Sequence, residues 1–363
     1  MAIDRDNDKV SLKRHFVLPG VVLAIVEAVV IAVPLYTVFG DSTPSATLLR
    51  IALPVFAGAE IAWAVLMLTS LLPIHRANKY ARRGESIPRS IAGAAYRATW
   101  NMPLWALAAR TALWVGASAV AGAFLVRYAG WTSRHVIELA AMTAVHAFVV
   151  SAVRAIWYQA ILARARARLF PAKPRLLRFA DGYGRRMLLV VLVAESGTVA
   201  AVSAFIYYFV PVTMAQYLQI QTFFPVWVAL ATCVWLAVAW RSRRRINAYL
   251  IASGVATGHI AADGGSRAEA EATPVYRLAQ LLPYRFAAAS LALWAGAATV
   301  ITYLANGRFR LELDDAVVIA GVILVIAVGA AIYEALWHRE AMRPLIEHLT
   351  LRHRLPVRGI RTS

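Results

Sequence analysis

The sequence is short of the residues on which most enzymes and disulfide-bonded proteins depend. Its 363 residues include a single cysteine, Cys233, so neither an intramolecular disulfide nor a cluster of thiolate metal ligands can form. Acidic residues number 19 against 38 lysines and arginines, which leaves few carboxylates for a metal cage. The HExxH, GxSxG and GxxxxGK[ST] motifs are absent from the sequence. We therefore expect a non-enzyme without a catalytic centre, a metal site or a cofactor.

Histidine is scarce too, and its placement argues against a two-haem cytochrome of the b type. That class needs pairs of histidines facing each other across helices at two depths, whereas His146 alone lies deep within an apolar run. His146 is a candidate for a ligand or proton site, and the plainer alternative is a hydrogen-bonded packing residue. Cys233 also lies within an apolar run, where we expect a small apolar packing residue.

Apolar residues, in contrast, are abundant. Hydrophobic residues make up 60% of the chain and the mean hydropathy is +0.61. A bilayer core about 30 Å thick is crossed by about 20 helical residues, whose backbone groups must pair within the segment. We therefore predict an all-α integral membrane protein. Its eight expected transmembrane spans are residues 16–39, 51–73, 103–126, 136–160, 187–209, 223–240, 286–304 and 316–337.

Lysine and arginine alternate sharply between the segments that connect these spans. The N-terminal segment carries 4 of them, and the segments after spans two, four, six and eight carry 6, 8, 7 and 6. The segments after spans one, three, five and seven carry only 1, 2, 0 and 2. Cytoplasmic segments of membrane proteins are rich in both residues. The net charge of +19 thus indicates contact with anionic lipid at the cytoplasmic face rather than nucleic acid. We expect a multi-pass protein of the bacterial inner membrane with both termini in the cytoplasm.

Three helices are expected to continue past the membrane on this basic side. Residues 76–83 and 241–250 follow spans two and six without glycine or proline, and residues 164–168 prolong span four in the same way. Their arginines suit contact with lipid headgroups, because a long side chain can extend toward the membrane surface.

The two halves of the sequence look like copies of one unit. Glu27 matches Glu195 at an offset of 168 residues, and residues 76–80 resemble residues 245–249 at an offset of 169. Such constant offsets within blocks indicate a duplicated helical unit, with chance matching of alanine-rich helices as the alternative. Because each copy holds four helices, the copies would be parallel and related by a pseudo-twofold axis along the membrane normal. At an offset of 180, Tyr96-Arg97, Pro103, Ala112-Leu113-Trp114 and Gly116 recur as Tyr276-Arg277, Pro283, Ala292-Leu293-Trp294 and Gly296.

This organisation divides the chain into five expected parts. A basic connector with Pro171 and Pro174 separates the two repeats. The parts are a cytoplasmic N-terminal segment at 1–15, the first transmembrane repeat at 16–170, the connector at 171–186, the second repeat at 187–341 and a basic cytoplasmic tail at 342–363.

Ionisable residues at membrane depth are costly and therefore mark candidate sites. Glu27, Glu60 and Glu195 fall near the middle of spans one, two and five. They are candidates for a proton-sensitive or cation-binding site, and the alternative is a protonated carboxyl that hydrogen-bonds a neighbouring helix. Ser196 follows Glu195 in the run Ser196-Gly197-Thr198, whose small residues make this region the expected polar pocket.

Three further ionisable residues lie nearer the ends of spans. Arg154 and Glu334 occupy matching positions of the two copies with opposite charge, so they pair if spans four and eight meet at the axis. In the alternative, Arg154 pairs within its own half or reaches the headgroups. Arg110 lies two turns into span three and is expected to extend toward the cytoplasmic surface.

Each half contains the block Tyr-Arg, then Pro103 or Pro283, then Ala-Leu-Trp-x-Gly. This block resembles repeats in the membrane input regions of some bacterial sensor histidine kinases and adenylate or guanylate cyclases. The likeness covers spans three and four of each half. In that family the membrane region precedes a cytoplasmic output domain. The resemblance therefore implies either signalling through a partner or the membrane part of a longer protein, and it carries over no functional residue.

These features favour a non-enzymatic sensory, regulatory or partner-binding membrane module that holds a small or lipid-soluble ligand between its repeats. One alternative is a proton-coupled small-molecule transporter, in which Glu27, Glu60 and Glu195 carry protons. Another is a structural subunit of a larger membrane complex. A protein partner or a second copy of the chain is compatible with all three.

Overall fold

The computed structural model describes residues 45–171, 175–252 and 266–353, which are helical apart from short turns. Strands do not occur in these ranges, which confirms the predicted all-α class. The helices are α2 (Ser45–Arg82), α3 (Arg89–Ala129), α4 (Ser133–Leu169), α5 (Arg175–Phe209), α6 (Met214–Ala252), α7 (Ser266–Leu304), the short π-helix η2 (Ala305–Phe309) and α8 (Leu313–His353).

Each long helix contains one of the predicted spans two to eight, and all seven are long and apolar enough to cross a membrane. The first predicted span, with Glu27, lies outside the described residues. Large apolar side chains cover the outside of the bundle: Leu53 is 67% exposed, Val325 74% and Leu336 62%. Such a surface is unfavourable in water, and the chain is a multi-pass membrane protein.

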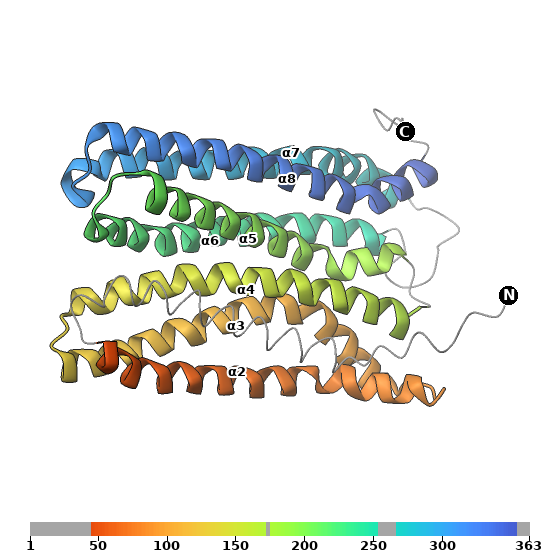
Figure 1. Ribbon diagram of the computed structural model, residues 1–363. Coiled ribbons are helices and arrows are strands. Elements are labelled where there is room, and N and C mark those ends of the chain that lie inside the picture. The colour runs from red at the N-terminus through yellow and green to blue at the C-terminus, as the bar shows by residue number, and fades with distance from the viewer. Residues whose placement is uncertain (1–44, 172–174, 253–265, 354–363) are drawn as a thin grey trace.

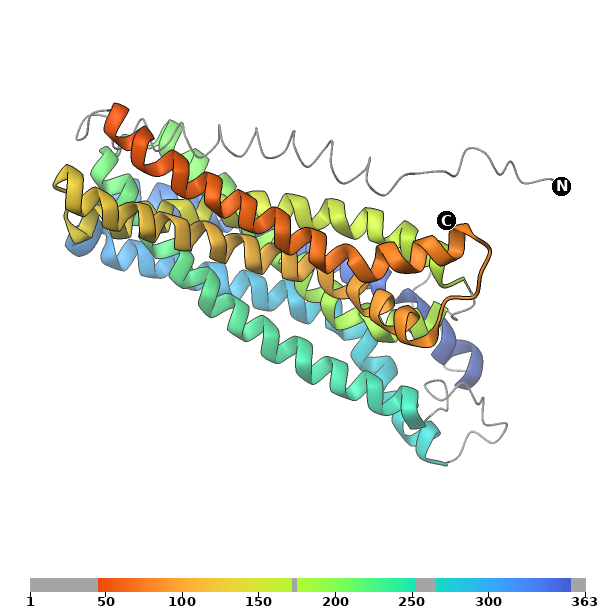
Figure 2. The same cartoon turned by 90° about the horizontal axis from the view of Figure 1, so that it is seen from below.

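The helices run up and down along one direction (Figures 1 and 2). In Figure 1, α2, α3 and α4 form one group and α5 to α8 form the other. Within the groups, α3 packs along α4 and α7 packs along α8, while α5 contacts α6 and α8. Between the groups, α5 also contacts α3 and α4, and α4 contacts α6. Helix α5 therefore lies at the seam between the two groups.

One end of the bundle collects the basic segments. The turns between α3 and α4, α5 and α6, and α7 and α8 lie at one end, whereas the α2–α3 turn and the C-terminal ends of α4, α6 and α8 lie at the other (Figure 1). This second end, here named the basic end, carries the helical extensions rich in arginine. Helices α2, α4 and α6 continue to Arg82, Leu169 and Ala252, which confirms the three predicted extensions.

Two expected boundaries differ from the structure. Helix α5 begins at Arg175, so most of the expected connector is helical. Its Tyr183 is 2% exposed and packs with Met187 in the core of the second group, which explains why this stretch folds with the span that follows. Helix α8 likewise continues to His353, into the expected tail.

The prediction that Cys233 packs in the interior is wrong, because its side chain is exposed on α6. The reason is its helical position relative to Trp235, which is 1% exposed. Two steps along an α-helix turn the chain by about 200°, so the residue two positions before Trp235 faces away from the core. An apolar run by itself does not say which face of a membrane helix is buried.

Candidate functional site

A pair of buried carboxyls lies inside the second group of helices. Glu195 comes from the middle of α5 and is 1% exposed, and Glu334 comes from α8 and is 0% exposed. The two helices pack against each other. The donors to the two carboxyls are also neighbours, because Trp235, which donates to Glu195, stacks on Phe286, one helical turn before Ser290, which donates to Glu334. The sequence marked both residues but did not predict that they meet. We name Glu195 and Glu334 the carboxyl pair.

Each carboxyl has one hydrogen-bonded oxygen. The indole Nε1 of Trp235 in α6 donates to Glu195 Oε1 at 3.2 Å. The hydroxyl of Ser290 in α7 donates to Glu334 Oε1 at 3.5 Å, which is long for such a bond. The Oε2 atoms of both carboxyls have no hydrogen-bond partner among the described residues. Both donors are neutral, so they cannot balance two negative charges.

Aromatic rings pack against the carboxyl pair on the side of the basic end. Trp235 stacks on Phe286 with ring centroids 5.0 Å apart, and the Phe286 ring contacts the tilted ring of His338 at 4.3 Å. His338 follows Glu334 by one helical turn and is 0% exposed, and neither ring nitrogen has a hydrogen-bond partner among the described residues. The pair therefore lies in a largely apolar interior.

The structure does not bring Ser196 to the carboxyl pair. The Ser196 hydroxyl donates to the backbone oxygen of Val193 at 2.8 Å, and Thr198 donates in the same way to Ala194 at 3.0 Å. Hydroxyls in helices often bond back to their own preceding turn. The donors to Glu195 and Glu334 come from α6 and α7 instead, which no local pattern around Glu195 reveals.

The first group contains a paired carboxylate. Arg110 of α3 donates through Nη2 and Nη1 to the two oxygens of Glu60 of α2, at 2.6 and 3.2 Å. The Trp114 indole also donates to Glu60 at 2.9 Å. The rings of Trp63 and Trp114 lie 5.4 and 5.7 Å from the guanidinium carbon, within the range of cation–π attraction.

This pair corrects the expectation that Arg110 extends toward the surface, because Arg110 is 2% exposed. Burial of the guanidinium is tolerated since a carboxylate and two indole rings replace its water. A sequence signal was available: spans two and three each contain a single ionisable residue, Glu60 and Arg110, with opposite charge.

The structure does not join Arg154 to Glu334. Both side chains are buried, but no ion pair links them in the described part of the chain. The reason is that α5 packs against both α4 and α8 and lies between them. On α4, His146 Nδ1 lies 2.8 Å from the backbone oxygen of Met142 in its own helix, a contact typical of a packing residue.

A small groove opens where α4, α5 and α8 meet, and it therefore lies between the two groups. Its volume is about 100 Å³. Four of its residues are apolar side chains of α4 and α5, and Tyr333 and Trp337 of α8 form the opposite wall. Polar groups enter from Gln159 and Arg186. The full lining is Ile156, Gln159, Arg186, Leu189, Val190, Val193, Tyr333 and Trp337.

Arg186 also belongs to a tight junction between the groups. Its guanidinium carbon lies 4.6 Å from the ring centroid of Trp100 in α3, and that of Arg166 in α4 lies 3.8 Å from the same ring. Arg166 Nη1 donates to the backbone oxygen of Thr99. Gly182 of α5 leaves the space that Trp100 fills. The junction holds α3, α4 and α5 together near the basic end.

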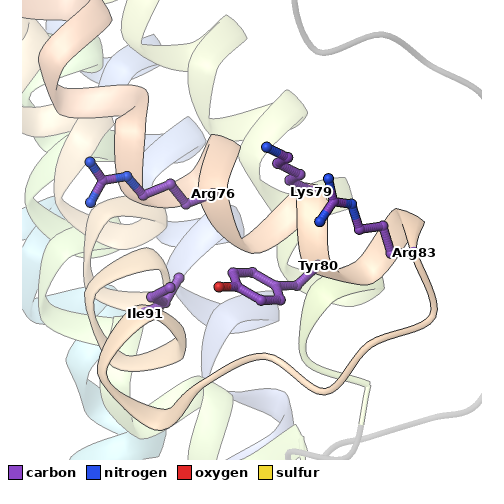
Figure 3. Close-up of a pocket in the computed structure, with 5 residues that line it drawn as sticks. All are labelled: Arg76, Lys79, Tyr80, Arg83 and Ile91. Atoms are coloured by element: carbon purple, nitrogen blue, oxygen red, sulfur yellow. The ribbon is translucent and has the colours of Figure 1, made fainter.

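A second hollow lies at the α2–α3 turn. Arg76, Lys79, Tyr80, Arg83 and Ile91 line a cavity of about 330 Å³, in which Tyr80 extends toward Ile91 (Figure 3). The three cations are exposed, and Arg83 lies 3.9 Å from Glu85. This open basic surface suits lipid headgroups better than it suits a selective ligand site.

In the described ranges, no group of three or more histidine, cysteine or acidic residues is arranged to hold a metal ion. Comparisons with protein-family models, curated proteins and solved structures found no match. A functional proposal therefore rests on the geometry of this chain alone.

Proposed function

We propose that this membrane protein is a non-enzymatic sensory or regulatory module that binds a lipid-soluble ligand with an anionic head in the groove between α4, α5 and α8. The observation that carries this proposal is the groove itself, whose lining is mostly apolar and includes one arginine. Because its residues come from both groups, a bound molecule would change how the groups sit against each other.

The polar groups of the groove define the ligand chemistry. Arg186 offers a cation and Gln159 an amide, whereas Val190 and Val193 offer only apolar surface. A guanidinium binds carboxylate or phosphate through charge-assisted hydrogen bonds, and an acyl chain suits the apolar wall. A fatty acid or another acidic lipid therefore fits better than a cation or a sugar.

Several paired features support an origin of the two groups as repeats of one unit. Helices α4 and α8 begin at Ser133 and Leu313, which is the predicted offset of 180. Buried residues also recur at this offset, such as Arg154 with Glu334 and Trp114 with Trp294. The turns before α4 and α8 match as well, because Gly130 and Arg310 both have a positive φ, of 70° and 52°. The same backbone hydrogen bond closes each turn, from Trp131 N to Leu125 O and from Leu311 N to Ala305 O.

A signal would leave the groove through the basic end, which we assign to the cytoplasm from the positive-inside rule. The Trp100 junction links Arg186 of the groove to α3 and α4 at that end. A shift of α5 against α4 would therefore move the helical extensions. A partner protein at these extensions would provide the output.

The first prediction concerns the groove. In nanodiscs of phosphatidylcholine, we expect a diazirine-bearing fatty acid to label peptides that contain residues 156–159 and 333–337. Val193→Trp fills the groove and should reduce this labelling at least about tenfold, and Arg186→Gln should reduce it about tenfold by removing a charge-assisted bond. Mass spectrometry of the labelled peptides measures the effect.

The matched control is Val226→Trp on α6, whose 61% exposed side chain lies on the outside of the bundle. It should leave the labelling unchanged. Equal labelling of the wild type and Val193→Trp would contradict the proposal.

A proton-coupled transporter is the second candidate, and the carboxyl pair favours it because buried acidic residues carry protons in such proteins. In liposomes that contain a pH-sensitive dye, this candidate predicts proton movement under a substrate gradient that disappears in Glu195→Gln. The absence of flux under every imposed gradient would count against this candidate and in favour of the first.

A further inference from the structure

We propose that Glu195 and Glu334 form a one-proton site inside the second group of helices, in which Glu334 carries the proton and Glu195 is the carboxylate. The inference goes beyond the proposed function, because its ligand is a proton and the site lies inside one group rather than in the groove between the two.

The surroundings of the carboxyl pair compensate one negative charge at most. Trp235 and Ser290 are neutral donors, and no ion pair to either carboxyl occurs within the described ranges. Two like charges in an apolar interior repel each other and have lost their water. Binding one proton removes the repulsion and leaves only one desolvated charge, so the pair is singly ionised.

The hydrogen bonds distinguish the two carboxyls. Glu195 accepts a bond from the Trp235 indole at 3.2 Å. Such an N–H donor favours the charged form of its acceptor. Glu334 has only the long contact with the Ser290 hydroxyl. The negative charge is therefore better placed on Glu195, and the proton on Glu334.

Comparison of the two groups shows why the proton is needed here. At an offset of 180, Ser290 in α7 occupies the position of Arg110 in α3. In the first group that position supplies a guanidinium to Glu60. In the second group it supplies a hydroxyl, so a proton has to provide the positive charge that an arginine provides in the first.

Other titratable groups on the packed helices do not replace this proton. Helices α6 and α7 present Trp235, Phe286, Ser290 and Trp294 near the pair, none of which ionises. No described nitrogen of a basic side chain forms an ion pair with Glu195 or Glu334. On α8, the ionisable neighbour is His338, which lies one helical turn beyond Glu334 and contacts the Phe286 ring at 4.3 Å.

The test is infrared spectroscopy of the full chain in nanodiscs. At neutral pH we expect the wild type to show the carbonyl band of a protonated carboxyl, and Glu334→Gln to abolish that band. The matched control is Glu138→Gln on α4, whose carboxyl forms an ion pair with Arg134 at 2.8 Å. This substitution should leave the band intact.

Glu195→Gln provides a second measurement that does not depend on the folding of Glu334→Gln. Without the neighbouring negative charge, Glu334 has less need of the proton, so the pH dependence of its band should differ from that of the wild type. The proposal is overturned by any of three results: no protonated band in the wild type, an unchanged band in Glu334→Gln, or the same titration of the band in Glu195→Gln and the wild type.

Discussion

Glu60→Ala should destabilise the folded protein by about 3 kcal/mol, the lower end of the loss expected when one partner of a buried ion pair is removed. Arg110 is 2% exposed and donates to both oxygens of Glu60. Removing the carboxylate takes both of these bonds away from a buried guanidinium. We place the effect at the lower end because the Glu60 side chain is 31% exposed.

Unfolding in detergent by heat or by sodium dodecyl sulfate measures this loss. The informative control is the double variant Glu60→Leu with Arg110→Met, which removes both charges and keeps similar volume. Replacing both members of a buried ion pair by apolar residues is often neutral, so the double variant should recover most of the stability. A double variant less stable than Glu60→Ala would show that the ion pair is not what the single substitution disrupts.

Gly182→Ala should destabilise the protein by about 3 kcal/mol or prevent folding, through overpacking at the Trp100 junction. A Cβ atom at Gly182 would lie inside the contact distance of the Trp100 ring. The ring cannot move aside, because Trp100 is 2% exposed and lies against the guanidinium groups of Arg166 and Arg186. We expect the thermal midpoint to fall and the contact between α3 and α5 to loosen.

The same helix provides a matched control. Gly197 of α5 has no atom within 4 Å of its Cβ position. Because alanine favours a helix over glycine by about 1 kcal/mol, Gly197→Ala should leave stability unchanged or raise it. A second substitution, Trp100→Leu, should partly rescue Gly182→Ala by making room for the methyl group. Equal effects of the two glycine substitutions would refute the packing argument.

Much of the fold could be predicted from local sequence. Spans two to eight each fall within an observed helix, and the extensions after spans two, four and six are helical as expected. Both predictions depend on properties of one segment at a time: its length, its hydropathy and its lack of helix breakers. The connector was the exception, because Tyr183 packs in the core and thus joins residues 175–186 to α5.

The candidate sites were predicted less well. Glu60 and Glu195 were singled out by their depth, but their contacts with Arg110 and Trp235 were not predicted. Glu334 was matched with Arg154, whereas α5 brings Glu195 to it instead. A residue's depth follows from its place in a span, but its partner depends on which helices are neighbours and how each is rotated.

The sequence by itself determined that this is an all-helical membrane protein, where its helices run and which segments are basic. These properties follow from the need to satisfy backbone hydrogen bonds in a bilayer. Only the tertiary structure decided that Cys233 faces outward, that Arg110 is buried against Glu60 and that Glu195 meets Glu334. The physical reason is that rotating an apolar helix about its axis changes no backbone hydrogen bond, so its buried face is selected by packing against its neighbours.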